Sequence, residues 1–354
     1  MSGPCLGLIP IPPRLVGNRR SSHARCPPEA ASTFTPPVLR RLMLGLAAAL
    51  GLAAGPALAW PDKPVRLVVT FAAGGASDIV ARTMAEPLAM ALGQPVVVDN
   101  KPGAGGTIGG TEVVRSAPDG DTLMLSNSTP LSIGPWTVPK SPYDPVKQFS
   151  HIAMLGVAPV VILANPKSGP AGLKEMPKFD AANPGGSFGN GGPGSIGHIV
   201  GEMVKHDMKF GMTHIPYKGG APMTTDLIAG TIPVGIDVIT AHVPMMKSGQ
   251  LKGLAVTSRS RSPLAPDVPT VVEPGQPQLV AENDFGVSGP AGLPKDVVDK
   301  LAGALAAIVA DPAVLKRFEE LGITPLKMSS AQFGDDVAKQ IADWAPAIKA
   351  ADLK

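Results

Sequence analysis

Three glycine-rich segments of this chain each stand directly before a segment with helical spacing. The first N–H groups of a helix have no partner inside the helix and carry a partial positive charge, so such junctions suit a carboxylate or a phosphate. Glycine also lets the backbone approach a ligand closely. The candidate ligand-binding segments are Gly74-Gly75-Ala76-Ser77-Asp78, Asn190-Gly191-Gly192-Pro193-Gly194-Ser195-Ile196-Gly197-His198 and Tyr217-Lys218-Gly219-Gly220-Ala221.

Each segment alone could be a tight turn that binds nothing. Three together favour a binding site, because open α/β sheets bind ligands beyond the carboxyl ends of their strands. Two side chains have two interpretations each. Asp78 either interacts with free N–H groups at the start of its helix or faces the ligand, where it would attract an amino or hydroxyl group. Lys218 either neutralises an anion or is an ordinary solvated lysine.

Cofactor and metal motifs lack their usual context. Gly192–Gly197 matches G-x-G-x-x-G, but no clear strand precedes it and no acidic residue ends a strand about 20 residues later. His198, His206 and His214 are eight residues apart, which is not a metal-binding spacing. We therefore expect no cofactor and no metal.

An exported hydrolase is the alternative function. Gly185–Gly189 matches G-x-S-x-G with Ser187 at the nucleophile position, yet the segment 185–194 is expected to be a loop and not a strand followed by a helix. A hydrolase would use Ser187 or Ser195 with His198, and Asp237 would complete a triad. Helix capping and strand-end polar contacts explain these residues more simply, so we expect no enzyme activity.

The elements that must position these residues alternate between strand and helix, which predicts an α/β protein with a parallel sheet and covering helices. Strands are expected over residues 65–71, 96–98, 122–126, 159–164, 214–217, 231–239 and 251–258. Helices are expected over 78–92, 111–116, 195–206, 221–229, 242–248, 295–310, 312–321 and 330–345, the last one interrupted at Pro346.

Residues 1–59 have the pattern of a presequence. Arg40 and Arg41 precede the apolar run Leu42–Leu52, and Ala57-Leu58-Ala59 fits a signal-peptide cleavage site. Beyond residue 60 no run reaches the roughly 18 consecutive apolar residues of a transmembrane helix. The expected mature protein is therefore exported and periplasmic.

Removal of the presequence changes the charge and the cysteine count. Residues 1–59 hold six of the 31 basic residues and one of the 28 acidic residues, so the body has 25 basic and 27 acidic residues, a net charge of −2. The basicity of the whole chain therefore does not indicate nucleic-acid binding. Cys5 and Cys26 also lie there, so the mature chain would have no disulfide and no thiol chemistry.

From Trp60 to Lys354 the sequence resembles the tripartite tricarboxylate transporter substrate-binding proteins, also called Bug receptors. The matching stretches are WPDKPVRLVVTFAAGGASDIVAR (60–82), LGQPVVVDNKPGAGGTIGG (92–110), APDGDTLMLSN (117–127), PYDPVKQFSHIAML (142–155), GNGGPGSIGHIVGEM (189–203), HIPYKGGAPMTTDLIAGTIPVGID (214–237), SPLAPDVPTVVEPG (262–275) and SGPAGLPKDVVDKL (288–301).

The resemblance implies a two-lobed periplasmic-binding-protein fold of type 2 with a ligand cleft between the lobes. Lobe 1 would comprise residues 60–159 and 283–354, and lobe 2 residues 160–282. Carried over by position, the implied ligand-binding residues are Gly74, Gly75, Ser77, Asp78, Asn190, Gly191, Gly192, Ser195, His198, Tyr217, Lys218, Gly219, Ala221 and Asp237, with Ser126 and Ser128 as weaker candidates.

The implied function is capture of a small carboxylated molecule, which could be a dicarboxylate, a tricarboxylate, an amino acid or an aromatic acid. The expected partners are membrane transporter subunits or a sensor receptor, with no nucleic acid, and the protein is expected to be a monomer. The chain departs from the family at Ala72 and Ala73, near which proline is usual, at Pro193, and at Asn283–Gly286, where a tryptophan is common. These departures affect the expected ligand more than the fold.

We predict that the exported protein begins at Trp60 or within a few residues of it, because Ala57-Leu58-Ala59 ends the expected signal peptide. N-terminal sequencing of the secreted protein measures this directly. Retention of Met43 or any earlier residue would contradict the prediction.

Overall fold

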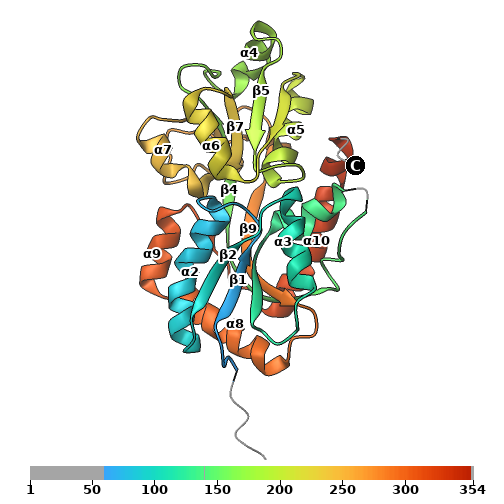
Figure 1. The fold of residues 1–354 in the computed structure, drawn as a ribbon. Helices are drawn as coiled ribbons and strands as arrows, with labels where there is room; N and C mark the ends of the chain where they lie inside the picture. The colour runs from blue at the N-terminus through green and yellow to red at the C-terminus, as the bar shows by residue number, and fades with distance from the viewer. Residues whose placement is uncertain (1–59, 139, 352–354) are drawn as a thin grey trace, which may run out of the picture. The chain divides into compact units, whose positions relative to one another are not determined.

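The computed structural model describes residues 60–138 and 140–351, which belong to one compact unit (Figure 1). The expected presequence, with its cleavage site and both cysteines, lies outside the described residues. Within the described part of the chain, no helix combines the length and the apolar character needed to cross a bilayer.

The described chain alternates between strands and helices along most of its length. The strands are β1 (Val65–Val69), β2 (Val96–Asn100), β3 (Thr122–Asn127), β4 (Phe149–Ala164), β5 (Ser187–Asn190), β6 (Thr213–Pro216), β7 (Val234–Val238), β8 (Lys252–Val256), β9 (Glu282–Pro290) and β10 (Thr324–Pro325). The α-helices are α2 (Ala76–Leu92), α3 (Thr107–Val114), α4 (Met176–Ala182), α5 (Ile196–Met208), α6 (Gly220–Ala229), α7 (Val243–Lys247), α8 (Lys295–Val309), α9 (Pro312–Glu320) and α10 (Ser330–Ala350).

Strand β1 is the centre of a parallel group, with β2 on one side and β3 on the other. Its side chains are almost all buried, as expected for a strand covered on both faces. Helix α2 lies on one side of β1 and α3 on the other (Figure 1). Val80, Met84 and Leu88 of α2 are fully buried at helical spacing. Burial of each such side chain stabilises the fold by roughly 1.5–3 kcal/mol.

Strand β4 changes partners along its length. From Phe149 to Pro159 it pairs antiparallel with β9, and from Val160 to Ala164 it pairs with β7 and β8. On the β7 side, β5 pairs in parallel with both β6 and β7. The lobe boundaries at 159/160 and 282/283 stay a prediction, which the change of partners at Val160 supports.

Thr257 ties together the two chain segments next to those boundaries. Its N–H donates to the Val160 carbonyl at 2.9 Å, and its Oγ1 accepts from the Val160 N–H at 2.9 Å. Its hydroxyl donates to the Ala281 carbonyl at 2.5 Å, and its own carbonyl accepts from the Ala281 N–H at 3.0 Å. Thr257 is fully buried, so water cannot replace these bonds.

Three expectations were wrong. The sheet is mixed and not parallel throughout, because β9 pairs antiparallel with both β3 and β4. The segment 185–194 contains strand β5, because Phe188 is buried and the backbone of Ser187–Asn190 pairs with β6 on one side and β7 on the other. Short strands made by tertiary pairing leave little signal in the sequence. Helix α10 also continues through Pro346. Pro346 is exposed, so water can bond the carbonyl that loses its helical partner.

We predict that Thr257→Val lowers the free energy of unfolding by about 1–3 kcal/mol, because valine keeps the shape and leaves the buried Val160 N–H without an acceptor. Thr257→Ser keeps the hydroxyl and should cost clearly less. Chemical denaturation of the three proteins measures the difference. Equal stability of the valine variant and the native protein would contradict this account of the contact.

Candidate functional site

The three glycine-rich junctions meet around one cavity. It is lined by Phe71, Gly75, Ala76, Ser77, Asn127, Thr129, Gly191, Ser195, Ile196, Gly220, Asp237, Val238 and Asn283. The space open to the centres of water molecules is about 30 Å³, which suffices for roughly two waters. An organic acid would therefore enter only if the segments around the cavity move apart.

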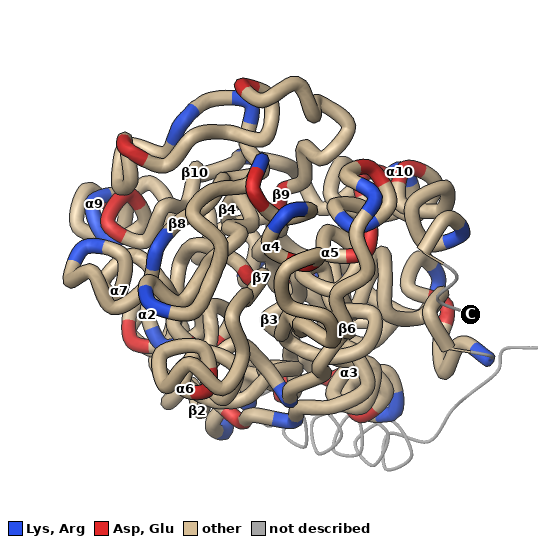
Figure 2. Tube along the Cα trace, turned by 90° about the horizontal axis from the view of Figure 1, so that it is seen from above, with Lys and Arg blue, Asp and Glu red and all other residues tan. Residues whose placement is uncertain are grey.

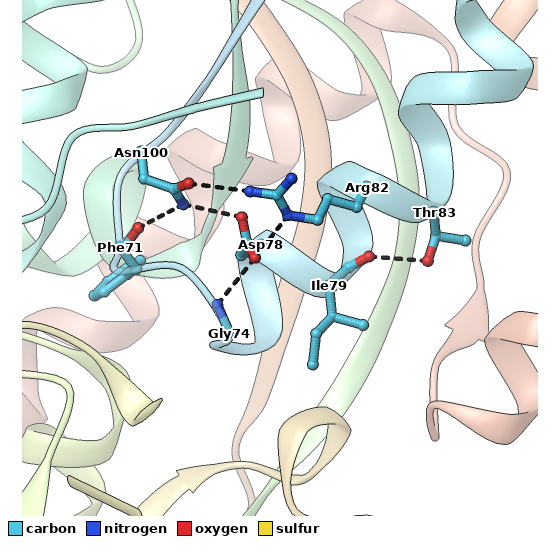
Figure 3. Close-up of polar contacts among 7 residues, drawn as sticks. All are labelled: Phe71, Gly74, Asp78, Ile79, Arg82, Thr83 and Asn100. Atoms are coloured by element: carbon cyan, nitrogen blue, oxygen red, sulfur yellow. Dashed lines mark hydrogen bonds and ion pairs between the residues drawn. The ribbon is translucent and has the colours of Figure 1, made fainter. Parts of the chain in front are cut away.

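The first junction leads from β1 into α2, and the Asp78 side chain holds it in place by hydrogen bonds (Figure 3). The Gly74 N–H donates to Asp78 Oδ2 at 2.9 Å, which holds Gly74 at a φ of +82° that favours glycine. Arg82 Nε donates to the same oxygen at 3.0 Å, and Asn100 Nδ2 donates to Asp78 Oδ1 at 3.1 Å. Asn100 also donates to the Phe71 carbonyl at 3.0 Å, so the loop is fixed at both ends.

The ionised form of Asp78 is favoured by these donors. Burial alone would raise the pKa of Asp78, but hydrogen bonds from Arg82, the Gly74 N–H and Asn100 outweigh burial and hold the pKa below its ordinary value. Of the two interpretations of Asp78, the structure supports the local one. The side chain organises the loop and is not among the residues that line the cavity.

The second junction leads from β5 into α5 and is fixed by Asn190. Its Oδ1 accepts from the Gly192 N–H at 2.9 Å, from His214 Nε2 at 3.0 Å and from the Ser195 hydroxyl at 3.3 Å. Asn190 is fully buried. One amide oxygen therefore sets the course of the backbone from the end of β5 to the start of α5.

The Ser195 hydroxyl and the His198 imidazole each accept a hydrogen bond from a backbone N–H, and the two side chains do not bond to each other. Ser195 caps α5, because its Oγ accepts from the His198 N–H at 3.2 Å. The Gly194 N–H donates to His198 Nδ1 at 3.1 Å. Within the described contacts, no hydrogen bond joins Ser195 Oγ to an imidazole nitrogen, so the nucleophile–base pair that a hydrolase needs is not formed.

The His198 ring stacks on His214 with the centroids 3.7 Å apart. Burial lowers the pKa of His198 to about 3, with a smaller contribution from His214, and burial lowers the pKa of His214 to about 4. Both rings are therefore neutral near pH 7, and His198 is a poor general base there. Among the described residues, no group of three or more His, Cys, Asp or Glu is placed to hold a metal ion.

The third junction leads from β6 into α6 and touches the first one. The Ala72 N–H donates to the Lys218 carbonyl at 3.3 Å, while the Lys218 side chain is exposed. The Tyr217 hydroxyl donates to Asp226 at 2.7 Å, which directs it away from the cavity. Gly219 has a φ of +139°, a conformation that favours glycine.

Strand β3 and the helical turn that follows it both contribute side chains to the cavity. Asn127 and Thr129 line it. Ser126 and Ser128 face the other way: Ser126 Oγ lies 3.1 Å from Ser288 Oγ, and Ser128 Oγ accepts from the Asp284 N–H at 2.9 Å. Strand alternation separates Ser126 from Asn127, because successive side chains of a strand point to opposite faces. Ser128 and Thr129 stand at the start of the helical turn after the strand, so alternation does not place them.

The predicted residues thus fall into two groups. Those that line the cavity are Gly75, Ser77, Gly191, Ser195 and Asp237, with Gly220 from the third segment. Those that lie outside its lining are Gly74, Asp78, Ser126, Ser128, Asn190, Gly192, His198, Tyr217, Lys218, Gly219 and Ala221. Ala76 and Ile196 also line it and belong to the first and second segments. The lining residues outside these predictions are Phe71, Asn127, Thr129, Val238 and Asn283. Strand ends could have indicated Asn127 and Val238, because both close a strand at the ligand-binding edge.

The sequence from residue 80 to 353 matches the family model described as tripartite tricarboxylate transporter family receptor. The chain belongs to this family. Members of the family bind solutes, as the resemblance of the sequence implied.

Solved structures share the fold. The periplasmic binding protein BugD is 37% identical, with a TM-score of 0.78, and the match covers 83% of this chain and 99% of BugD. MatC from Rhodopseudomonas palustris with bound malate is 30% identical, with a TM-score of 0.79 and coverage of 82% and 100%. An R. palustris protein with adipate is 29% identical, with a TM-score of 0.79 and coverage of 83% and 98%. The two-lobed periplasmic-binding-protein fold is therefore confirmed.

We predict that Asp78→Asn lowers the free energy of unfolding by roughly 1–3 kcal/mol near pH 7, because the loop loses charge-assisted hydrogen bonds from Arg82 and the Gly74 N–H. The folded-state pKa of Asp78 is depressed, so its contribution is complete well above the unfolded pKa of about 3.9 and is lost as the pH falls through the folded pKa. Denaturation at several pH values should show the gap closing below about pH 4. A gap that is constant down to pH 2 would contradict it.

Proposed function

We propose that this protein is a periplasmic solute-binding protein that captures a small carboxylated molecule in the cavity between the three glycine-rich junctions. The observation that carries the proposal is the convergence of hydrogen-bond donors on this cavity. The bound form is then recognised by membrane transporter subunits or by a sensor receptor. The protein acts by binding as a monomer, without catalysis and without a cofactor.

The start of α2 is the first source of donors. Its N-cap residue is Gly75, and no side chain caps the helix. The N–H groups of the first turn are therefore available to an anion next to Ala76 and Ser77, both of which line the cavity. Helix α5 differs, because the Ser195 hydroxyl already accepts from the His198 N–H.

Two hydroxyl groups are the second source of hydrogen-bond donors. Ser77 Oγ accepts from Asn127 Nδ2 at 2.8 Å, which leaves the Ser77 proton for another acceptor. Thr129 Oγ1 accepts from the Ile196 N–H at 3.2 Å, which leaves the Thr129 proton in the same way. Both residues line the cavity, so two hydroxyl donors and a helix start serve one space. A carboxylate, which only accepts, matches this set of donors.

Capture requires the cavity to open and close. The contacts between Ala72 and Lys218 and between Ile196 and Thr129 join segments on opposite sides of the cavity, so they must separate as a ligand enters. A ligand that binds the closed form better than the open form shifts the population towards closure. The closed form then presents a surface that differs from the open one and that a membrane partner can recognise.

The related structures support a carboxylate as the ligand class. Malate and adipate are both dicarboxylates, and the proteins that bind them share the family fold over nearly their whole length. The contacts of Ser195 and His198 described above weigh against the hydrolase alternative. A binding assay without turnover is therefore the appropriate first experiment.

We predict that a thermal-shift screen of carboxylic acids identifies a ligand, since a ligand at about 100 times its Kd adds about 2.7 kcal/mol of apparent stability. Gly75→Val should then weaken binding at least about tenfold, or roughly 1.4 kcal/mol. A Cβ at Gly75 would lie 3.4 Å from the Ala72 carbonyl oxygen and 3.8 Å from the Gly220 nitrogen, so it fits. Because Gly75 lines the cavity, we expect the methyl groups of valine to occupy space that the ligand needs.

Gly172→Val is the matched control. Gly172 has an extended backbone, and a Cβ there has no neighbour within 4 Å, so the same side chain enters open space away from the cavity. Isothermal titration of both variants decides the outcome. Unchanged affinity in a folded Gly75→Val protein, or loss of affinity in both variants, would place the site elsewhere.

A further inference from the structure

Asp237 is an acidic side chain in a cavity whose other described lining residues are uncharged. The lining otherwise offers glycines, hydroxyl groups, two amides and apolar side chains. Basic and acidic residues are instead interspersed around the outline of the molecule (Figure 2). The charge that a ligand meets inside the cavity is therefore negative, although the donors of the first junction suit an anion.

The structure holds the Asp237 carboxylate in a defined position. His242 is fully buried, and its Nε2 lies 3.2 Å from Asp237 Oδ2. Its Nδ1 lies 3.4 Å from Thr224 Oγ1, and the Thr224 hydroxyl donates to the Gly220 carbonyl at 2.8 Å. This chain of contacts connects the end of β7 to the first turn of α6, and it holds the carboxylate in place through Oδ2.

One oxygen of Asp237 is left for a ligand. Oδ2 has His242 as its partner, and among the described contacts Oδ1 has none. Gly220 leaves room for the carboxylate in this position, because a Cβ there would overlap Asp237 Oδ2. An ionised carboxylate only accepts hydrogen bonds, so the group that meets Oδ1 must donate one.

The cavity therefore has two chemically different ends. The start of α2, with Ser77 and Thr129, donates and suits a carboxylate. Asp237 accepts and repels a second carboxylate placed next to it. A plain dicarboxylate satisfies the first end and conflicts with the second, whereas an acid with a hydroxyl or ammonium group satisfies both.

We propose, on the basis of the function proposed above, that the ligand is a carboxylic acid that also carries a hydroxyl or ammonium donor, and that Asp237 selects it by accepting a hydrogen bond from that donor. His242 is a positioning residue for Asp237. Asp237 is thereby the residue that determines specificity between donor-bearing acids and plain acids of the same length.

Matched sets of acids test the proposal by isothermal titration. Each set has one chain length and differs only at C2: propionate, lactate and alanine; succinate, malate and aspartate; glutarate, 2-hydroxyglutarate and glutamate; adipate, 2-hydroxyadipate and 2-aminoadipate. In the chain length that binds, we expect a donor-bearing acid to bind roughly 10- to 100-fold tighter than the plain acid. Asp237→Asn should reduce this preference at least about tenfold, mainly for the ammonium compound, and should improve binding of the plain acid.

Asp335→Asn is the control, because it makes the same change in charge at an exposed position of α10 that is not part of the cavity lining. Equal or tighter binding of the plain acids by the native protein would overturn the proposal, as would an unchanged preference in Asp237→Asn. In both cases, if Gly75→Val abolishes the binding, the proposed carboxylate-binding function would still hold. Failure of every acid to bind the native protein would overturn both proposals together.

Discussion

The Ala72 N–H donates to the Lys218 carbonyl at 3.3 Å, so two loops that are 146 residues apart in sequence touch through their backbones. This approach depends on residues without side chains. A Cβ at Gly219 would lie 3.1 Å from the Ala72 nitrogen and 3.3 Å from the Ala72 Cβ, which is tighter than an ordinary contact. Larger side chains at these positions would hold the three junctions apart. The three junctions meet around one cavity because their backbones approach each other this closely.

Glycine-rich loops have many conformations, and buried polar side chains restrict them here. Asp78 fixes the first junction by accepting from Gly74, and Asn190 fixes the second by accepting from Gly192. Each side chain lies behind its loop, where its oxygens are satisfied by the protein. The entropy that glycine loses on folding is thus offset by hydrogen bonds that do not compete with the ligand.

The sequence predicted the positions of the three junctions because a glycine-rich turn before a helix is a local property. It could not predict which side chains face the cavity, because that depends on where each strand ends and on contacts between distant segments. Ser126 and Ser128 were expected at the ligand, yet Asn127 and Thr129 line the cavity. Strand β5 was missed for a related reason: four residues between glycines become a strand only through pairing with β6 and β7. Asp78 has two interpretations in the sequence, because only the fold places Arg82 and Asn100 around its carboxylate.

Among the described lining residues, the cavity has helix N–H groups and hydroxyls where many anion sites have arginine or lysine. Mobile ions screen attraction between exposed charges over about 10 Å at 0.1 M salt, but they act weakly on buried dipoles and on contacts inside a closed cavity. Retention of an acid by such donors would therefore vary little with ionic strength. Where the salt concentration around a protein follows that of the external medium, this arrangement gives a constant affinity. A basic patch on the surface would not.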